Sequence, residues 1–371
     1  MDHADTTFDQ AKAYQRKRQL LTFIHLILTP SLLLVAIVMP ISQMFNLWSF
    51  QISSNLYAAL ACYFVFFALY TLIFDFPLAF YSGFLLEHQF ALSNQTLLAW
   101  VKDFFKKSAL SFLLSLLLLE GLFALIWNFP SLWWIFAWAG YALVSFGLGK
   151  VFPVLIVPLF YKYGKLENQS LKEKIFNLAN RYGLPLENVY TLDLSKTTKK
   201  ANAAFMGMGK TKRVVLSDTL LANFTEEEIE TVVAHELGHF KHHDIWKQLG
   251  LGILTSLAGF WIVFRLMEPL THFFGFNGPA DIASMPLLFL IFYVFGLGLM
   301  PLQNGFSRCL ERAADGFALS ACPDRNVFIS CMEKLGKVNL ADPDPHPLYE
   351  WIFYDHPSIG KRIRMAKMQA G

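Results

Sequence analysis

The stretch "NFTEEEIETVVAHELGHFKHHD" (residues 223–244) predicts a helix with reactive side chains on one face. Thr225 and Glu228 form a capping box, and the glutamates of the first turn suit the positive end of the helix dipole. A repeat of 3.6 residues per turn then places His235 and His239 one turn apart on the same face, with Glu236 beside them. The helix would therefore present two imidazoles and a carboxylate together.

This pattern suits metal-assisted hydrolysis. Neutral imidazoles bind zinc at about 2.0–2.1 Å, and two of them one helical turn apart are aimed at a single point. Zinc lowers the pKa of a bound water to about 7, and a neighbouring carboxylate such as Glu236 can accept the proton of that water. The same spacing also arises by chance in unrelated helices. A catalytic site therefore needs a third protein ligand from elsewhere in the chain.

The chain is far more apolar than a soluble domain. Hydrophobic residues make up 55% of its 371 residues and charged residues 16%, with a mean hydropathy of +0.41. Soluble domains carry about 25% charged residues. A bilayer core of about 30 Å takes roughly 20 apolar residues of helix. Six segments qualify as membrane spans: residues 20–40, 56–74, 108–127, 132–149, 249–266 and 285–302.

The connecting segments give these spans an orientation. Lys and Arg gather in "QRKR" (15–18), "VKDFFKK" (101–107) and "YKYGK" (161–165), whereas the segments on the other side carry none apart from Arg265. Basic connecting segments stay in the cytosol. We therefore expect a multi-pass integral membrane protein with both termini and residues 160–248 in the cytosol.

Two details of the spans stay open. The apolar run "VFPVLIVPLF" (151–160) is too short to span alone, and it would extend the fourth helix or lie along the interface. The second span could continue past Asp75 toward Glu87.

The net charge of +3 is too small to indicate a nucleic-acid partner, and none is expected. The four cysteines lack CxxC spacing and are expected to be free thiols.

The polar part of the chain has mixed secondary structure. "SLKEKIFNLANRYG" (170–183) predicts an amphipathic helix, "NVYTLDLS" (188–195) a strand, and "AAFMGMGKTKRVVLSD" (203–218) two strands joined at a Gly-Lys turn. The expected organisation has four segments. These are a membrane domain of four spans at 1–160, a cytosolic segment with the β-hairpin and the histidine helix at 161–248, two further spans at 249–304, and a second cytosolic segment at 305–371.

A candidate third ligand lies directly after the last span, in "NGFSRCLERAADGFAL" (304–319). Glu311 and Asp315 lie one helical turn apart, so Glu311 could complete the metal site while Asp315 holds a ligand histidine. The alternative is a charged helix end in which Arg308 and Arg312 form surface ion pairs. The first interpretation is favoured because the predicted topology also places Glu311 at the cytosolic boundary, near the histidine helix. His242 and His243 are not expected to be ligands, because a further ligand would fill the position that water requires.

These residues resemble the CAAX prenyl endopeptidases, which are integral-membrane zinc metalloproteases of the gluzincin type. The resemblance covers nearly the whole chain and depends on the order and spacing of its segments. "YSGFLLEHQFALSNQT" (81–96) resembles the signature of that family's membrane domain, and "PLFYKYGKLENQSLKEKI" (158–175) resembles its approach to the polar part. "ANAAF", "RVVLSDTLL", "HELGHFKHH", "SRCLERAAD" and "YDHPSIGKRI" follow in the family's order.

The resemblance implies roles for particular residues. His235, His239 and Glu311 would bind one zinc ion per chain, and Glu236 would be the general base. Asp315 matches an acidic residue that either orients a ligand histidine or donates a proton, and the first role is favoured physically.

Three further residues would act on the substrate. Asn202 would hold the peptide backbone along an edge strand. His356 would steady the oxyanion of the tetrahedral intermediate. Arg362 would lie among the substrate-binding residues, and we expect it to brace the site more than to touch the substrate. Without the resemblance, Asn202 would be an ordinary turn asparagine and His356 a histidine ahead of a loop proline.

The expected fold is mainly α. It is a polytopic bundle of six or seven transmembrane helices that enclose a cavity, with a cytosolic gluzincin-like protease domain that carries a small β-sheet. The resemblance implies a membrane-embedded zinc metalloendopeptidase that cleaves peptide bonds near the C-terminus of prenylated CAAX-type substrates. The expected partners are a peptide or protein substrate and the lipid bilayer.

Two alternatives remain: a membrane quality-control protease of the same clan, and a channel or transporter with structural histidines.

The chain departs from the family in having six firm spans rather than the seven of eukaryotic members. It also carries "NAAF" in place of "NAYF".

Overall fold

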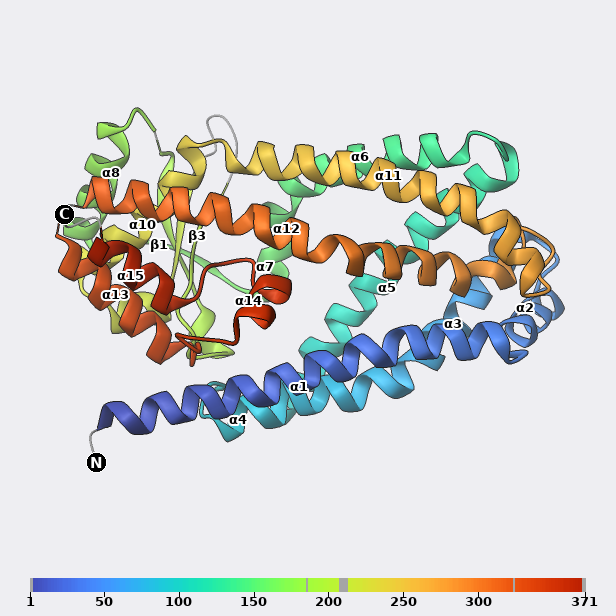
Figure 1. The fold of residues 1–371 in the computed structure, drawn as a ribbon, viewed down its shortest axis with the longest axis horizontal. Helices are drawn as coiled ribbons and strands as arrows, with labels where there is room; N and C mark the ends of the chain where they lie inside the picture. Colours follow the sequence, from blue (N-terminus) through green and yellow to red (C-terminus); the bar gives the residue numbers. More distant parts are fainter. Residues whose placement is uncertain (1–2, 185, 207–212, 323, 369–371) are drawn as a thin grey trace.

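Long helices run along most of the molecule and give it an elongated shape (Figure 1). The computed structural model describes residues 3–184, 186–206, 213–322 and 324–368. Six helical stretches in these residues are long and apolar enough to cross a membrane: Asp9–Val38, Leu56–Gln89, Leu97–Asn128, Trp133–Phe160, Asp244–Phe273 and Ile282–Ala321. Each predicted span coincides with one of them to within two residues at either end or lies inside it, and the described residues provide no seventh. The predicted count of six firm spans is therefore confirmed.

The elements follow in a simple order. The first half contains α1 (His3–Val38), α2 (Ile41–Ile52), α3 (Leu56–Phe80), η1 (Tyr81–Leu85), α4 (Leu86–Gln89), α5 (Leu97–Asn128), α6 (Trp133–Val151), η2 (Phe152–Ile156) and α7 (Val157–Phe160). The central part contains β1 (Tyr163–Lys165), α8 (Gln169–Arg181), β2 (Asn188–Leu192), η3 (Leu194–Lys196), β3 (Ala203–Met206), β4 (Arg213–Ser217), α9 (Asp218–Asn223) and α10 (Glu226–Lys241). The chain ends with α11 (Asp244–Phe273), η5 (Ile282–Ser284), α12 (Met285–Ala321), α13 (Arg325–Val338), α14 (Pro347–Phe353) and α15 (Ile359–Met368).

Both segments left open by the sequence continue their helices. The second span runs on through the π-helical turn η1 and α4 as far as Gln89, and the run 151–160 extends the fourth helix through η2 and α7. Proline removes a backbone donor and crowds the preceding turn. Pro77 precedes the first π-helical turn and Pro153 lies inside the second, so a wider turn accommodates the proline without ending either helix.

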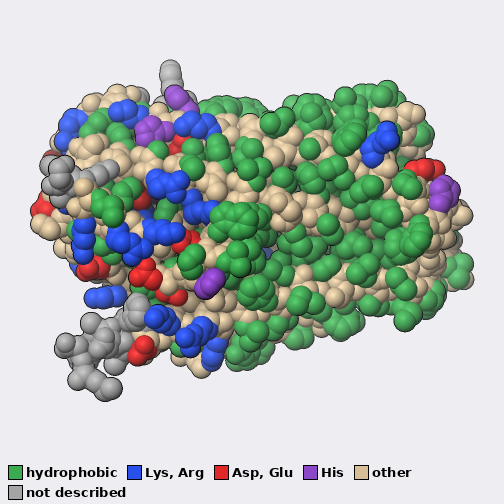
Figure 2. Space-filling view, in the orientation of Figure 1, with side chains coloured by type: hydrophobic (Ala, Val, Ile, Leu, Met, Phe, Trp, Pro, Cys, Tyr) green, Lys and Arg blue, Asp and Glu red, His purple; other side chains and the backbone are tan. Residues whose placement is uncertain are grey.

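The surface divides into an apolar part and a charged part. Figure 2 shows hydrophobic side chains covering the body of the molecule, while most lysines, arginines and acidic residues gather at the end that carries the sheet. Large side chains on the long helices are exposed, including Ile73 at 69%, Leu117 at 69% and Leu143 at 74%. Such a continuous apolar surface is stable against lipid and unfavourable in water. The long helices are therefore the membrane-embedded part.

The sheet is small and mixed, with the strand order β1-β2-β4-β3. β3 and β4 form the predicted antiparallel hairpin, with Ala203 opposite Leu216 and Phe205 opposite Val214. The predicted Gly-Lys turn lies outside the described residues. β2 pairs parallel to β4, and the unpredicted three-residue β1 adds to its other side. β3 therefore lies at the edge of the sheet.

The packing of α10 against α12 determines where the reactive side chains meet. A Cβ atom on Gly238 would lie 3.0 Å from the Cα of Ala314, which is closer than side chains normally approach a backbone. Gly238 lies between His235 and His239, and Ala314 lies between Glu311 and Asp315. The absence of a side chain on Gly238 therefore lets the two helices approach at the level of these four residues.

The expected segment boundaries at 248 and 304 fall inside continuous helices. α11 begins at Asp244 and runs without a break into the apolar part, while α12 returns from the apolar part as far as Ala321. α12 crosses the predicted boundary between 249–304 and 305–371. The last membrane helix itself therefore carries Glu311 to the histidine helix.

Candidate active site

The helix that begins the site forms as predicted. The side chain of Thr225 accepts from the backbone N–H of Glu228, and the Glu228 carboxylate accepts from the backbone N–H of Thr225, which completes the capping box. The helix α10 then continues through the HExxH sequence to Lys241. His235 is buried, and Glu236 and His239 are half-buried. The cap fixes the start of the helix and hence the direction of both histidines.

The structure brings Glu311 to the two histidines. Ligand atoms of His235, His239 and Glu311 all lie within 4.8 Å of one another. Nε2 of His235 lies 3.2 Å from Nε2 of His239 and 3.2 Å from Oε2 of Glu311, and Nε2 of His239 lies 3.2 Å from Oε1 of Glu311. The three side chains predicted as metal ligands thus converge from α10 and α12.

Two aspartates hold the outer nitrogens of these histidines. Nδ1 of His235 lies 2.8 Å from Oδ1 of Asp315, and Nδ1 of His239 lies 3.0 Å from Oδ2 of Asp244. A carboxylate accepts hydrogen bonds, so each Nδ1 carries a proton and donates it. In the neutral rings, both Nε2 atoms then present lone pairs toward the same point. Asp315 therefore fixes the orientation of the His235 ring, and Asp244 fixes that of the His239 ring.

Asp244 is a residue that the sequence reasoning missed. It is the first residue of α11, and the preceding His243 adopts a left-handed backbone with φ of 58°. This sharp reversal between α10 and α11 brings Asp244 back toward His239. The available signal was an acidic residue shortly after the second histidine, but its direction depends on the turn.

The site attracts positive charge. Burial lowers the pKa of His235, but the neighbouring carboxylates of Asp315 and Glu311 outweigh burial and raise that pKa to about 9. Burial likewise lowers the pKa of His239, and the carboxylates of Glu311 and Asp244 raise it overall. A cluster that binds a proton this strongly also favours a metal cation.

The donor set fits a divalent metal ion. Oε2 of Glu311 is buried and accepts no hydrogen bond from the described residues, although it lies 3.2 Å from Nε2 of His235. Two imidazole lone pairs and a carboxylate oxygen therefore face one another at a distance that is unfavourable without a cation between them. Two histidines and a glutamate are a ligand set known for catalytic zinc.

Arg362 contacts the cluster through Asp315. Its Nε donates to Oδ2 of Asp315 at 2.8 Å, and its Nη2 donates to Oδ1 at 2.5 Å. Arg362 is 9% exposed and Asp315 is fully buried, so the pair is withdrawn from solvent. A buried guanidinium held by two hydrogen bonds keeps Asp315 ionised and fixed in direction. The expected bracing role of Arg362 stays a prediction, and these two hydrogen bonds are the contacts that it requires.

His356 lies on the open side of the cluster. Its Nε2 lies 3.2 Å from Oε1 of Glu311, its Nδ1 lies 2.9 Å from Oδ1 of Asp355, and its side chain is 54% exposed. The hydrogen bond to Asp355 raises the pKa of His356 above its ordinary value, against the opposing effect of burial. Because Asp355 holds the proton on Nδ1, only the protonated ring carries a second proton on Nε2. His356 can then donate a hydrogen bond from its Nε2–H toward the cluster.

A cavity of about 1010 Å³ connects His356 with Asn202. Its walls also include Tyr14, Arg18, Lys200 and Arg362. Asn202 is exposed and directly precedes β3, the strand at the edge of the sheet. Its backbone carbonyl accepts from the backbone N–H of Ser217, and its own backbone N–H donates to Oγ of Ser217. The side chain of Asn202 is therefore held at the start of a free strand edge.

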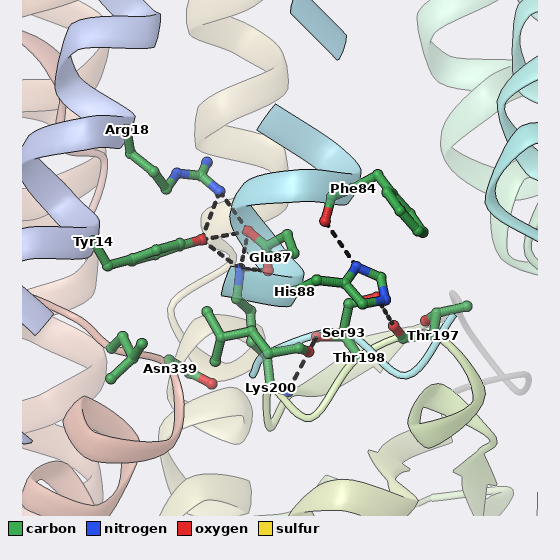
Figure 3. A network of polar contacts seen from close by, with 12 residues as sticks. Tyr14, Arg18, Phe84, Glu87, His88, Ser93, Thr197, Thr198, Lys200 and Asn339 are labelled. Carbon is green, nitrogen blue, oxygen red and sulfur yellow. Dashed lines mark hydrogen bonds and ion pairs between the residues drawn. The ribbon is translucent and has the colours of Figure 1, made fainter. Parts of the chain in front are cut away.

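The membrane helices α1 and α4 hold the segment that leads to Asn202 (Figure 3). Lys200 lies 2.8 Å from Oε2 of Glu87 and donates to the hydroxyl of Tyr14 at 2.9 Å. The hydroxyl of Tyr14 donates to Oε1 of Glu87 at 2.5 Å, and Arg18 donates to that hydroxyl at 3.1 Å. The side chain of Glu87 is 13% exposed, so this ion pair is largely shielded from water.

Backbone contacts add to this attachment. The backbone carbonyl of Leu92 accepts from the N–H of Lys199 at 2.8 Å and from the hydroxyl of Thr198 at 3.0 Å. Ser93 pairs with Thr198 in an isolated antiparallel bridge. The segment 91–96, part of the signature noted in the sequence, thus lies against the segment before Asn202. The sequence did not reveal the partnership of Glu87 and Lys200, because it joins residues far apart in the chain.

Comparisons with known proteins identify the family of this chain. Residues 165–370 match the model of peptidase family M48, and residues 2–162 match a model described as CAAX prenyl protease N-terminal, five membrane helices. Over that second range the described residues hold four candidate spans and the shorter helix α2.

Individual relatives cover most of the chain. YhfN, an uncharacterized metalloprotease of Bacillus subtilis, is 31% identical over 77% of this chain and 68% of its own length. The CAAX prenyl protease 1 homolog of Arabidopsis thaliana is 31% identical over 78% of this chain and 69% of its own. CAAX prenyl protease 1 of Saccharomyces cerevisiae is 30% identical over 78% of this chain and 68% of its own.

A solved structure confirms the fold. The crystal structure of S. mikatae Ste24p matches with a TM-score of 0.82 and 25% sequence identity, over 99% of this chain and 90% of that one. The match covers both the membrane helices and the polar end that carries α10 and Glu311. The chain therefore belongs to peptidase family M48 and is a metalloendopeptidase embedded in the membrane.

Proposed function

We propose that this metalloendopeptidase cleaves peptide bonds near the C-terminus of CAAX-type substrates, prenylated ones among them, with one zinc ion per chain held by His235, His239 and Glu311. The observation that carries the proposal is the convergence of these three side chains beside a cavity that reaches Asn202. The names of the relatives in Arabidopsis thaliana and Saccharomyces cerevisiae supply the substrate class.

The substrate backbone would lie along the free edge of β3. An extended peptide can add to an edge strand through main-chain hydrogen bonds, and a neighbouring amide side chain fixes its position. Asn202 directly precedes β3 and lines the same cavity as His356. Asn202 would therefore bind and orient the peptide so that the scissile carbonyl reaches the metal ligands.

The residues around the metal would divide the chemistry between them. A bound zinc ion supplies a Lewis acid that polarises the scissile carbonyl and acidifies water. The Glu236 carboxylate accepts the proton of the attacking water and passes it to the nitrogen of the leaving amine. His356 donates from Nε2 to the oxygen that becomes negative as the carbonyl is attacked. Asp315 and Asp244 keep the ligand histidines in the tautomer that the metal requires.

The site would face the cytosol. The basic segments at 15–18, 101–107 and 161–165 belong to the same side as the sheet by the predicted topology, and charged side chains gather at that end of the molecule. Basic segments remain on the cytosolic side of a membrane. A protease reporter or cysteine labelling from each side of sealed vesicles would test this orientation.

The test of the function compares two variants on a farnesylated CAAX peptide and on unfolded casein. Glu236→Gln should keep the zinc and lose cleavage by about 10²–10⁴-fold, because a positioned general base contributes that much. His239→Ala should lose both zinc and cleavage. Stoichiometric zinc with turnover unaffected by Glu236→Gln would contradict the catalytic assignment. Preference for casein over the CAAX peptide would instead favour a quality-control protease.

A further inference from the structure

A second cavity lies next to the start of the edge strand β3. It has a volume of about 630 Å³ and is lined by Asn202, which also lines the larger cavity that holds His356. Side chains from α5 and from the η2–α7 segment form its membrane-side wall: Leu110, Leu114, Phe152, Ile156 and Phe160. Ala203 and Ala204 of β3 form the opposite wall. The proposed peptide site therefore adjoins two cavities of different character.

The lining distinguishes the two cavities. The larger one is lined by Arg18, Lys200, Asp342, Asp355 and His356, among others. Among the described residues, the smaller one has a single charged lining residue, Lys107, and is otherwise lined mainly by aliphatic and aromatic side chains. A polar or charged peptide segment is favoured in the first cavity, and an apolar group in the second.

Specific contacts hold the walls of the second cavity together where the membrane helices meet the sheet. The Nζ atoms of Lys106 and Lys107 lie 4.9 and 5.7 Å from the centre of the Phe160 ring. Lys106 also donates to the backbone carbonyl of Leu159. These contacts hold the N-terminal half of α5 against α7 and so fix the width of the cavity at its charged rim.

The size and position of the cavity favour a chain attached to the substrate. Its volume falls within the range of about 300–1,000 Å³ that is typical of sites for small organic ligands. Side chains of an extended peptide alternate between the two faces of the sheet to which it adds. One substrate residue bound at Asn202 would therefore direct its side chain toward this cavity.

We propose that this cavity is the subsite for the isoprenyl chain of the substrate, attached through its cysteine sulfur. The inference rests on the proposed function and extends it to the site of lipid recognition. Leu114, at 39% exposed, and Phe152, at 53%, belong to two candidate membrane spans. An isoprenyl chain dissolved in the bilayer can therefore reach the cavity without crossing water, while its peptide reaches Asn202 from the polar side.

The kinetic test uses one peptide whose cysteine carries an S-methyl, S-geranyl or S-farnesyl group. In the wild type, kcat/KM should rise with chain length, on the order of a hundredfold from methyl to farnesyl, because each buried methylene adds to binding. Leu114→Trp and Leu148→Trp fill the cavity from two helices and should reduce this farnesyl-to-methyl ratio to about tenfold or less. Leu117→Trp, on the same helix as Leu114 and 69% exposed, is the control that should keep the ratio.

A binding test does not depend on turnover. A photoreactive isoprenyl group on the same peptide, added to zinc-loaded Glu236→Gln, should label residues 107–114 and 152–161. Labelling around Tyr14 and Tyr349 instead, or a farnesyl-to-methyl ratio unchanged in both tryptophan variants, would overturn the inference. Labelling that phospholipid abolishes, and that the farnesylated peptide does not compete, would make the cavity a lipid site and also overturn it.

The two hypotheses fail in different ways. If wild-type protein cleaves no member of the peptide series, the proposed function is wrong, and the labelling pattern still decides whether the cavity binds the isoprenyl chain. If the farnesylated peptide is cleaved and the ratio does not respond to Leu114→Trp or Leu148→Trp, the proposed function stands and the subsite assignment fails.

Discussion

Oε2 of Glu311 lies 3.2 Å from Nε2 of His235, although the two residues belong to different helices that are separated in sequence by two membrane crossings. α12 leaves the apolar part as one continuous helix and carries Glu311 to α10. Gly238 lets the helices approach at this level, since a side chain there would meet the backbone of Ala314. The proposed metal site thus joins the membrane-embedded and polar parts of the molecule.

The two aspartates that hold the ligand histidines should differ in their effect on stability. Asp244→Asn and Asp315→Asn should each weaken zinc binding by about 10–100-fold, because both orient a ligand imidazole. Asp315 is also the buried partner of Arg362. Asp315→Asn should therefore cost a further 3–5 kcal/mol, roughly, in the free energy of unfolding, because it leaves a buried guanidinium unpaired.

Zinc competition titration and chemical unfolding of the metal-free protein measure these two quantities separately. Asp344→Asn is the matched control, since Asp344 pairs with Arg364 at the surface with side chains 59% and 50% exposed. An exposed pair of this kind contributes about 0–1 kcal/mol. Equal unfolding free energies for Asp244→Asn and Asp315→Asn would contradict the bracing role of Arg362.

The alkaline limb of the pH–activity profile should belong to His356. Asp355 holds the proton on Nδ1 and raises the pKa of His356, and only the protonated ring can donate from Nε2. Activity should therefore fall as the pH rises through this pKa. Asp355→Asn removes the negative charge, lowers the pKa and should move the alkaline limb of kcat/KM to lower pH by about one unit.

The measurement is a pH profile of kcat/KM for the wild type, Asp355→Asn and His356→Ala. His356→Ala should reduce kcat by about 10²–10³-fold and remove the limb that Asp355→Asn displaces. A limb that keeps its position in Asp355→Asn, or that persists in His356→Ala, would assign the titration to another group.

The ion pair between Glu87 and Lys200 should act on substrate binding through Asn202. Glu87→Gln and Lys200→Met each free the segment before β3 and should lower kcat/KM by about tenfold, mainly by raising KM. Because both changes break the same contact, the double variant should cost about as much as the worse single variant. Zinc affinity should not change.

Lys174 and Glu227 form a suitable control pair, because they are 3.1 Å apart on the surface and line neither cavity. Breaking that pair should leave KM unaltered. Fully additive losses in the Glu87→Gln/Lys200→Met double variant would show that the two residues act independently and would contradict the positioning role.

The sequence predicted the local features of the site well. The capping box and the spacing of His235 and His239 follow from helix periodicity, and the structure contains both. The six spans and the β3–β4 hairpin follow from hydropathy and alternation, which depend only on neighbouring residues. The placement of Glu311 needed the topology of the spans in addition.

Long-range contacts could not be predicted in the same way. Asp244 reaches His239 only because His243 adopts a left-handed backbone. The pairing of Glu87 with Lys200 joins α4 to a loop of the polar part, and no pattern along the chain encodes it. β1 has three residues and was too short to stand out, while the parallel pairing of β2 with β4 depends on the crossover between them. His356 was found only through the resemblance to a family.

The most direct test of the central claim is the zinc content and zinc affinity of Glu311→Ala, measured beside the wild type and Arg312→Ala. Arg312 is the exposed neighbour of Glu311 on the same helix. The wild type and Arg312→Ala should bind about one zinc ion per chain, with spectroscopic signatures of two imidazoles and a carboxylate. Glu311→Ala should keep its helical content and lose stoichiometric zinc. Wild-type zinc affinity in Glu311→Ala would contradict the account, because the metal would then not join α10 to the last membrane helix.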